Sequence, residues 1–487
     1  MPAKNSTNTP WPAFGFAAVF ALLLSGCASY TQNTQGMRDA WSAGNVQQAA
    51  QIATAKAKAD SDSVDALLWQ LEAGATTRAN SQWNDSLLAF DQAENLFDYW
   101  DARPEFSISR EAGATMVNQT ILPYRGHAYD KIMAASYQAL NYLDLGKPDQ
   151  ARVELNRAYQ YQKDAVAANA SNIAAAQTAA AKASADSRKN PDSTDTYDVN
   201  RAQNDPQFNA NIHQAYGDLD NLKAYAPYVN PFSIYLQGLY YLASAQTLSD
   251  YEQARVAFKQ VKDLIGSNPN IDADYDLANQ LASGNLTTPP PLTYVIFETG
   301  MAPIRTEIRI DIPLFIVSRQ VPYVGVAFPQ LQYNAQFCPG LTIQAANTPA
   351  LHTVLLCDMD RVIAQDFKNE LPTIIIKTLI SAGAKAAAQY GLYEATKNNG
   401  YASLFATVAG VVYQAATNQA DLRTWVTLPK QFTYCRLPTP ADRKLVLFAD
   451  GSGTSETVDL PPGVITLVYV KSNNYANRIL VHAITLR

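Results

Sequence analysis

The spacing of apolar residues predicts helices from residue 28 to about residue 286. Apolar side chains recur there at intervals of three and four, and the strict alternation of a half-buried strand is absent. The clearest segment, residues 132–162, is typical of two antiparallel helices separated by Gly146 and Pro148, which break the chain. Small side chains on the facing sides would let these helices approach closely: Ala135, Ala139, Ala151 and Ala158.

One part of the helical region has little apolar surface to bury. Residues 164–185 contain 12 alanines in 22 positions, and residues 186–208 are polar, with Pro191 and Pro206 as helix breakers. We expect a mobile surface insertion near 186–208, which would act either as a spacer or as a binding segment.

After residue 286 the pattern changes from helices to strands. Three prolines predict a stiff linker at 287–291. Residues 304–312 then place isoleucines on one face and the charged Glu307, Arg309 and Asp311 on the other, which is typical of a half-buried strand. Further strands are expected at 321–328, 352–357, 423–428, 431–436, 443–449, 463–471 and 478–486. The sequence therefore predicts an α+β multidomain protein, with a helical domain over 27–286 and an antiparallel, sandwich-like β-rich domain over 292–487.

An apolar helical hairpin is expected inside the β-rich domain, at residues 371–419. Pro372 suits a first helical turn, and KNNG at 397–400 suits the turn between the two helices. Two interpretations stay open, insertion into a membrane and burial against the sheet. Lys377 and Lys385 inside the first helix favour burial.

The amino-terminal residues predict a lipid anchor. The uncharged run from Ala13 to Gly26 follows Lys4 and is shorter than the roughly 20 residues that cross a bilayer, so it indicates a signal peptide over 1–26. Leu24-Ser25-Gly26-Cys27 resembles the lipobox of bacterial lipoproteins. The resemblance implies thioether lipidation and palmitate-type acylation at Cys27, and Ala28 in place of Asp implies the outer membrane. An accidental cysteine in a plain secreted leader is the alternative.

The charge of the chain argues against nucleic-acid binding, and its cysteines allow a disulfide. The chain has 487 residues, a net charge of −6 and a pI near 5.3, so it lacks the basic field that nucleic acid requires. In an oxidising compartment Cys338 and Cys357 can form a disulfide. The alternative is that these two and Cys435 are buried thiols that act as small hydrophobic residues.

Candidate chemistry is sparse. The four histidines are far apart, and the common nucleophile, zinc and phosphate-loop motifs are absent. His127 has Asp130 close by, so the pair can tune a base or simply cap the helix that begins there. Asp358, Asp360, Asp366 and Glu370 can gather a cation, or can be a solvated capping cluster. We expect no catalytic site, no metal and no cofactor.

Several stretches resemble tetratricopeptide repeats. The second-helix signature occurs around Ala49, Ser86, Ala151 and Ala254, at intervals of 37, 65 and 103 residues, so any array is degenerate or interrupted. YRGHAYDKIMAASYQALNYLDLGKPDQARVELNRA, FETGMAP and ADLRTWVTLPK resemble a group of bacterial tetratricopeptide-type outer-membrane lipoproteins. Genes of that group often neighbour those of LpoB-like activators of penicillin-binding proteins, which implies a place in the cell envelope.

The expected function is therefore that of a non-enzymatic, periplasm-facing scaffold in cell-envelope or peptidoglycan assembly. A concave helical surface would bind a protein partner. Candidate contact residues are Tyr137, Tyr142, Tyr159 and Tyr241, with ordinary inter-helix packing as the alternative. Two other classes stay open. The 27 tyrosines and 6 tryptophans are compatible with a glycan-binding or glycan-processing cleft. The other class is an assembly factor for a secretion or appendage machine.

Overall fold

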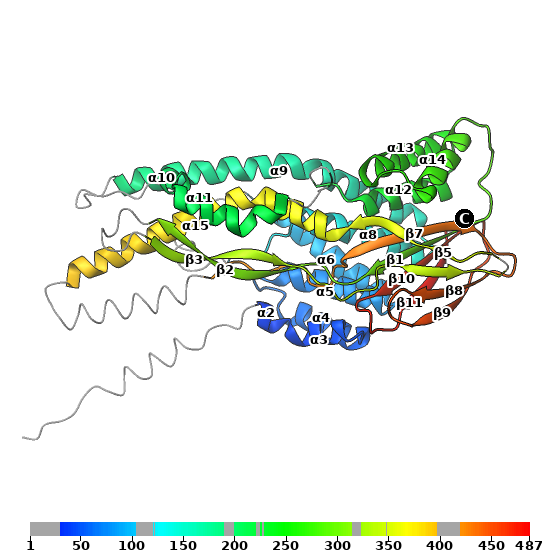
Figure 1. Cartoon of the computed structure of the whole chain (residues 1–487), viewed down its shortest axis with the longest axis horizontal. Coiled ribbons are helices and arrows are strands. Elements are labelled where there is room, and N and C mark those ends of the chain that lie inside the picture. Colours follow the sequence, from blue (N-terminus) through cyan, green and yellow to red (C-terminus); the bar gives the residue numbers. More distant parts are fainter. Residues whose placement is uncertain are drawn as a thin grey trace, which may run out of the picture.

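The computed structural model describes residues 30–103, 120, 122–188, 199–220, 225, 228–313, 323–346, 348–396 and 419–487. Helices fill the described chain as far as Ala282, and strands begin at Leu292 (Figure 1). The predicted mixture of a helix-rich first part and a sheet-containing second part is confirmed. The leader, Cys27 and residues 397–418 of the expected hairpin, which include its turn, lie outside the described residues.

Antiparallel helix pairs make up the first part of the chain. Gly146, at φ 66°, closes the turn between the two helices that the sequence predicted most clearly, in the left-handed region that glycine adopts without strain. The four small residues at that crossing are buried. The helices are α2 (Tyr30–Asn33), α3 (Gln35–Ser42), α4 (Val46–Ala59), α5 (Ala66–Ala79), α6 (Trp83–Asp101), α8 (Ala128–Asp144), α9 (Pro148–Arg188), α10 (Val199–Gln203), α11 (Pro206–Tyr216), the 3-10 helix η2 (Gly217–Asp220), α12 (Pro231–Ala243), α13 (Leu248–Ile265) and α14 (Pro269–Ala282).

The expected surface insertion near 186–208 is partly helical. Within it, α10 and the start of α11 bury Val199, Ala202 and Phe208. Asp205 begins α11 by accepting a hydrogen bond from the Phe208 amide, and Pro206 occupies the first turn, so this proline starts a helix where a break was expected. Residues 189–198 lie outside the described chain.

The described strands form three sheets. The central one has the order β11-β10-β1-β7-β6, a second has the order β5-β4-β8-β9, and β2 and β3 pair alone. Because β1 runs parallel to β10, the central sheet is mixed, and the expectation of a purely antiparallel sheet is wrong. The strands are β1 (Leu292–Thr299), β2 (Ile304–Pro313), β3 (Tyr323–Gln332), β4 (Leu341–Gln344), β5 (Leu351–His352), β6 (Val354–Asp358), β7 (Gln431–Pro438), β8 (Lys444–Ala449), β9 (Ser455–Asp459), β10 (Ile465–Ser472) and β11 (Leu480–Thr485).

The central sheet is the middle of three layers. Alternate residues of β1 pack on opposite sides: Val295 and Phe297 join the apolar cluster shared with the four-stranded sheet, whereas Tyr294 and Ile296 join the cluster shared with the helices. Strands β1 and β10 are buried on both faces, which fits the uninterrupted apolar runs 294–297 and 467–470 within them. The helices and the central sheet share one hydrophobic core, although the sequence pattern changes at residues 287–291.

The first helix of the expected hairpin begins earlier than the sequence suggested. Helix α15 runs from Met359 to Thr396, with Pro372 inside it. The Asp358 carboxylate accepts hydrogen bonds from the amides of Asp360 and Arg361, and this caps the helix 12 residues before the expected start at 371. The long helix therefore continues directly from β6.

Residues 423–428 are not a strand. They form an irregular segment whose polar groups are held by Glu72 of α5, which accepts hydrogen bonds from the Val426 amide at 2.8 Å and the Thr427 hydroxyl at 2.6 Å. Trp425 packs against Phe90 of α6. The side chains of residues 423–428 are thus buried among helices, and this segment is not part of a sheet. Within the described residues, helices of the length and apolar character needed to cross a bilayer are absent.

Candidate functional site

The structure separates the four tyrosines that were expected to contact a partner. Tyr137 is buried, and its hydroxyl donates to Glu298 of β1 at 3.0 Å. Tyr241 is also buried and donates to Asn156 at 3.3 Å, while Tyr142 is half-buried in the helical core. Tyr159 is 38% exposed. Only Tyr159 of these four has the exposure that a contact residue needs.

The inner surface of the helical array is covered by the chain's own sheet. Nearly every residue of α5, α8 and α12 is buried, which marks helices surrounded on all sides. Phe232 of α12 stacks on Phe432 of β7 with ring centroids 3.8 Å apart, and Tyr235 lies 4.7 Å from Tyr434. Figure 1 shows these helices against the strands. The expected concave partner surface is therefore an internal interface, and its placement at Tyr137 and Tyr241 is wrong.

Of the two interpretations of the cysteines, the structure has the buried thiols, and the possible disulfide between Cys338 and Cys357 is not formed. Both are free, buried thiols, and so is Cys435. Cys357 belongs to the core between helices and sheet, whereas Cys338 belongs to the core between the two sheets. The central sheet thus separates the two sulfur atoms, and burial raises the pKa of the Cys357 thiol.

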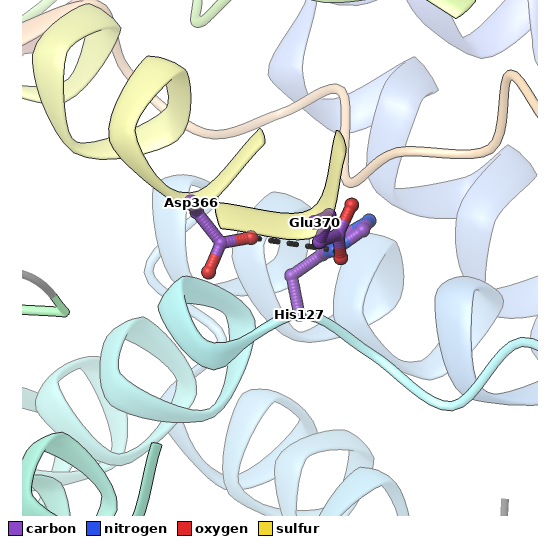
Figure 2. A group of neighbouring side chains, drawn as sticks. All are labelled: His127, Asp366 and Glu370. Carbon is purple, nitrogen blue, oxygen red and sulfur yellow. Dashed lines mark hydrogen bonds and ion pairs between the residues drawn. The ribbon is translucent and has the colours of Figure 1, made fainter. Parts of the chain in front are cut away.

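Charged residues from two distant segments, the start of α8 and helix α15, meet in the interior (Figure 2). His127 precedes this helix, and Asp366 and Glu370 lie four residues apart on one face of α15. The His127 Nδ1 atom is 2.6 Å from Glu370 Oε1 and 3.5 Å from Asp366 Oδ2. Arg305 of β2 donates from Nη2 to Glu370 Oε2 at 2.6 Å. These four side chains are called the His127 cluster below.

Neighbouring groups fix the position of the imidazole. The Asp130 carboxylate accepts from the His127 amide at 2.8 Å and from the Tyr124 hydroxyl at 2.5 Å. The ring of Tyr129 stacks on the imidazole with centroids 5.0 Å apart. Asp130 therefore caps α8, as one of the two interpretations of the sequence proposed, and it holds the backbone of His127 rather than its ring.

The charges of the cluster shift one another. Burial opposes a charged imidazole, but Glu370 and Asp366 outweigh this and raise the pKa of His127 to about 10. Burial also disfavours the charged form of Glu370, yet His127 and Arg305 lower the pKa of that carboxyl below its ordinary value. Burial raises the pKa of Asp366 to about 6. The negative charge of Glu370 is thus well balanced by neighbouring cations, whereas that of Asp366 is poorly balanced.

The cluster can hold an ion or tie elements together. One imidazole nitrogen and two carboxylate oxygens, one from each residue, lie within 4.8 Å of one another. His127 is only 8% exposed, which leaves little surface for a substrate molecule. The sequence had indicated His127 and the α15 carboxylates separately, and 243 residues separate His127 from Glu370. Arg305 was missed, because strand alternation assigns it to the exposed side with Glu307 and Arg309, whereas it is 7% exposed.

A second polar cluster lies between α5, α8 and the central sheet. Lys471 of β10 pairs with Glu298 of β1, and Arg78 of α5 pairs with Asp144 at 3.0 Å. Lys471, Glu298 and Arg78 border a cavity of about 20 Å³. Its lining consists of Ala75, Arg78, Ala79, Tyr137, Glu298, Tyr469, Lys471, Leu480 and His482. Such a volume accommodates about one water molecule. The lining has the aromatic and carboxylate groups of a glycan site but lacks the space for a sugar.

Comparison with known proteins reveals a distant structural similarity. The sequence matches no family model and no curated protein. A crystal structure of a tetratricopeptide repeat protein from Parabacteroides merdae ATCC 43184 is similar at 14% sequence identity, with a TM-score of 0.14. The alignment covers 51% of this chain and 98% of that chain. The likeness is distant.

Proposed function

We propose that this chain is a non-enzymatic lipoprotein, anchored in the outer membrane through Cys27, that serves as a periplasm-facing scaffold in cell-envelope or peptidoglycan assembly. The observation that carries this proposal is the position of Tyr30. Its side chain is 6% exposed and donates a hydrogen bond to Glu72 of α5 at 3.0 Å. The folded core therefore begins three residues after the lipobox cysteine.

A short tether restricts where the folded part can lie. Three residues span at most about 10 Å even when fully extended. Acyl chains on Cys27 would thus hold the face around α2 close to the membrane surface. A scaffold attached in this way presents its remaining faces to the periplasm in a defined orientation, which suits assembly of partners at the membrane.

A protein partner would bind the outer helices. Because the inner helices are covered by the sheet, the exposed sides of α6, α9 and α13 are the available helical surface. Several large apolar side chains are exposed there: Leu88, Tyr99, Val153, Tyr159, Val166, Leu248 and Val256. This surface replaces the concave one as the proposed contact region.

Fractionation tests the anchor. The wild-type chain is expected in the outer-membrane fraction, and Cys27→Ala in the soluble periplasmic fraction or as unprocessed precursor. Cys435→Ala, which removes a buried thiol instead, is the matched control and should fractionate as the wild type. Unchanged membrane association of Cys27→Ala would refute lipid anchoring at this residue.

Site-specific photo-crosslinking in cells tests the scaffold. A crosslinking residue at position 159 should capture a protein, and one at the buried position 137 should not. Mass spectrometry then identifies the captured chain. A peptidoglycan synthase or its activator supports a role in wall assembly, whereas a secretion or appendage component favours that alternative. Capture of abundant outer-membrane proteins alone would contradict the scaffold.

A further inference from the structure

The His127 cluster and the adjacent Asp130 together contain three carboxylates and two cationic side chains. Asp130 and Asp366 are buried and Glu370 is half-buried, and the cationic side chains beside them are those of His127 and Arg305. Glu370 contacts both of these side chains, and Asp130 accepts from a backbone amide and a tyrosine hydroxyl. Among the described residues, Asp366 forms an ion pair through the 3.5 Å contact of its Oδ2 atom with the imidazole. An isolated carboxylate at such depth is strongly disfavoured, so the site requires one further positive charge, from a proton or from a metal ion.

One oxygen of the Asp366 carboxylate, Oδ2, is directed into the site. Its side chain is 6% exposed, and within the described residues its Oδ2 atom has no hydrogen-bond partner. Figure 2 shows this oxygen directed toward the imidazole. Buried polar atoms usually have hydrogen-bond partners. A buried carboxylate oxygen without one, next to an imidazole nitrogen and a second carboxylate oxygen, points to a cation-binding site.

The donor atoms suit a divalent transition metal. An imidazole nitrogen and two carboxylate oxygens are ligands of Zn²⁺, whereas Ca²⁺ and Mg²⁺ prefer oxygen alone. Bond lengths of about 2.1 Å in a tetrahedral site separate two ligand atoms by about 3.4 Å. The 3.5 Å distance between His127 Nδ1 and Asp366 Oδ2 already matches this separation. The 2.6 Å hydrogen bond between His127 Nδ1 and Glu370 Oε1 would lengthen when the metal replaces the proton on Nδ1.

A neighbouring residue orients one ligand. Arg305 Nη2 donates to the other oxygen of Glu370 at 2.6 Å, so the carboxylate is held with Oε1 facing the imidazole. Arginine in this position also balances negative charge that would remain after a divalent ion is bound. Such outer contacts normally fix metal-binding carboxylates.

We propose that His127 Nδ1, Asp366 and Glu370 bind one Zn²⁺-like divalent transition-metal ion, which replaces the imidazole proton and clamps the start of α8 to α15. Three protein ligands leave a fourth position for water. Bound there, the ion would lock the long helix α15 and the neighbouring β2 onto the helical body. The proposed ion joins α8 to α15, and its binding is independent of the lipid anchor.

Calorimetric titration of ZnCl₂ into the full-length protein tests the proposal. The chain is purified in detergent without a histidine tag and is first dialysed against a chelator. We expect one saturable site, and measurements in two buffers of different ionisation enthalpy should reveal the release of about one proton per metal ion. Asp366→Asn should weaken binding at least about tenfold.

Asp360→Asn is the matched control. Asp360 is a buried carboxylate on the same helix, but it pairs with Lys430 and lies outside the His127 cluster. It should leave Zn²⁺ affinity unchanged. Equal affinity in the wild type and Asp366→Asn, or absence of one-to-one binding to the wild type, would overturn the proposal and leave a proton as the compensating charge.

A spectroscopic measurement on the wild type keeps the test valid if Asp366→Asn does not fold. Co²⁺ should bind with the visible absorption of a four-coordinate nitrogen and oxygen site and should be displaced by Zn²⁺. The pale spectrum of octahedral aqueous Co²⁺, unchanged by the protein, would exclude the site.

Discussion

The two faces of the central sheet are both buried, but they differ in the side chains that fill the interface. Toward the four-stranded sheet, strands β1, β7 and β10 place apolar side chains, such as Val295, Phe297 and Val470. Toward the helices, the same strands place Glu298, Arg436 and Lys471 among aromatic rings. Both faces are fully buried. One interface is held by apolar contact, and the other by apolar contact and buried ion pairs.

This difference shows what buried charge contributes. Apolar packing tolerates many arrangements, whereas a buried ion pair is stable only when its partner is correctly placed. The helix-side groups come from segments far apart in the chain: Tyr137 of α8, Tyr469 and Lys471 all contact Glu298. We infer that this polar layer fixes how the helices sit on the sheet, and the predictions below test that inference.

The largest effect is expected from Glu298→Ala. Removing this carboxylate leaves the Lys471 ammonium buried without a partner, so the free energy of unfolding should fall by about 3–5 kcal/mol. Phe297→Leu, one residue away on the opposite face, should lose only about 1–2 kcal/mol because it alters apolar contact alone. Chemical denaturation measures both values.

A double variant sharpens the same comparison. If the ion pair mainly provides specificity, Glu298→Leu combined with Lys471→Met should recover most of the stability lost in Glu298→Ala. A loss below about 1 kcal/mol for Glu298→Ala would contradict the role assigned to the polar layer.

The next effect is a pH dependence due to Glu72. Burial raises the pKa of this carboxyl from 4.5 to about 7, so the folded chain holds a proton that the unfolded chain has released. Stability should therefore fall as pH rises from about 4.5 to 7, by about 3 kcal/mol from this group. Glu72→Gln should flatten that part of the profile, which thermal melts at several pH values would show. An unchanged slope in the variant would assign the dependence to other carboxyls.

A smaller effect is expected from Tyr137→Phe. The change deletes a hydrogen bond to Glu298 but keeps the aromatic ring, so stability should fall by about 1–2 kcal/mol. Chemical denaturation of Tyr137→Phe in the wild-type and Glu298→Ala backgrounds measures the coupling free energy between these two side chains. Additive losses in that double variant would mean that the hydrogen bond contributes nothing.

The smallest effect on stability is expected from Tyr159→Ala. This side chain is 38% exposed, so its loss should change the free energy of unfolding by less than about 0.5 kcal/mol. Any loss of crosslinked partner in this variant would then reflect binding rather than folding. A loss of stability similar to that of Tyr137→Phe would instead place Tyr159 in the core.

The sequence predicted local structure well where periodicity is strong. The helix pair at 132–162 and the exposed charges of residues 304–312 are found as expected. It failed where the environment is set by distant segments. Residues 423–428 alternate like a strand but bind Glu72 and pack among helices, and Pro372 lies inside a helix that Asp358 had already started.

The candidate site shows the same limit. His127 and the α15 carboxylates were each noticed, but no local pattern relates residues 243 positions apart, and Arg305 follows an alternation typical of exposed residues.

By itself the sequence determined the division into a helix-rich first part and a strand-containing second part, the acidic balance and the resemblance of residues 24–27 to a lipobox, because each depends on residues close together along the chain or on composition. The tertiary structure alone decided that the sheet fills the inner surface of the helices, that the cysteines stay apart and that His127 meets Asp366 and Glu370. These features arise from packing between distant segments, where burial and charge compensation depend on neighbours that the local sequence does not specify.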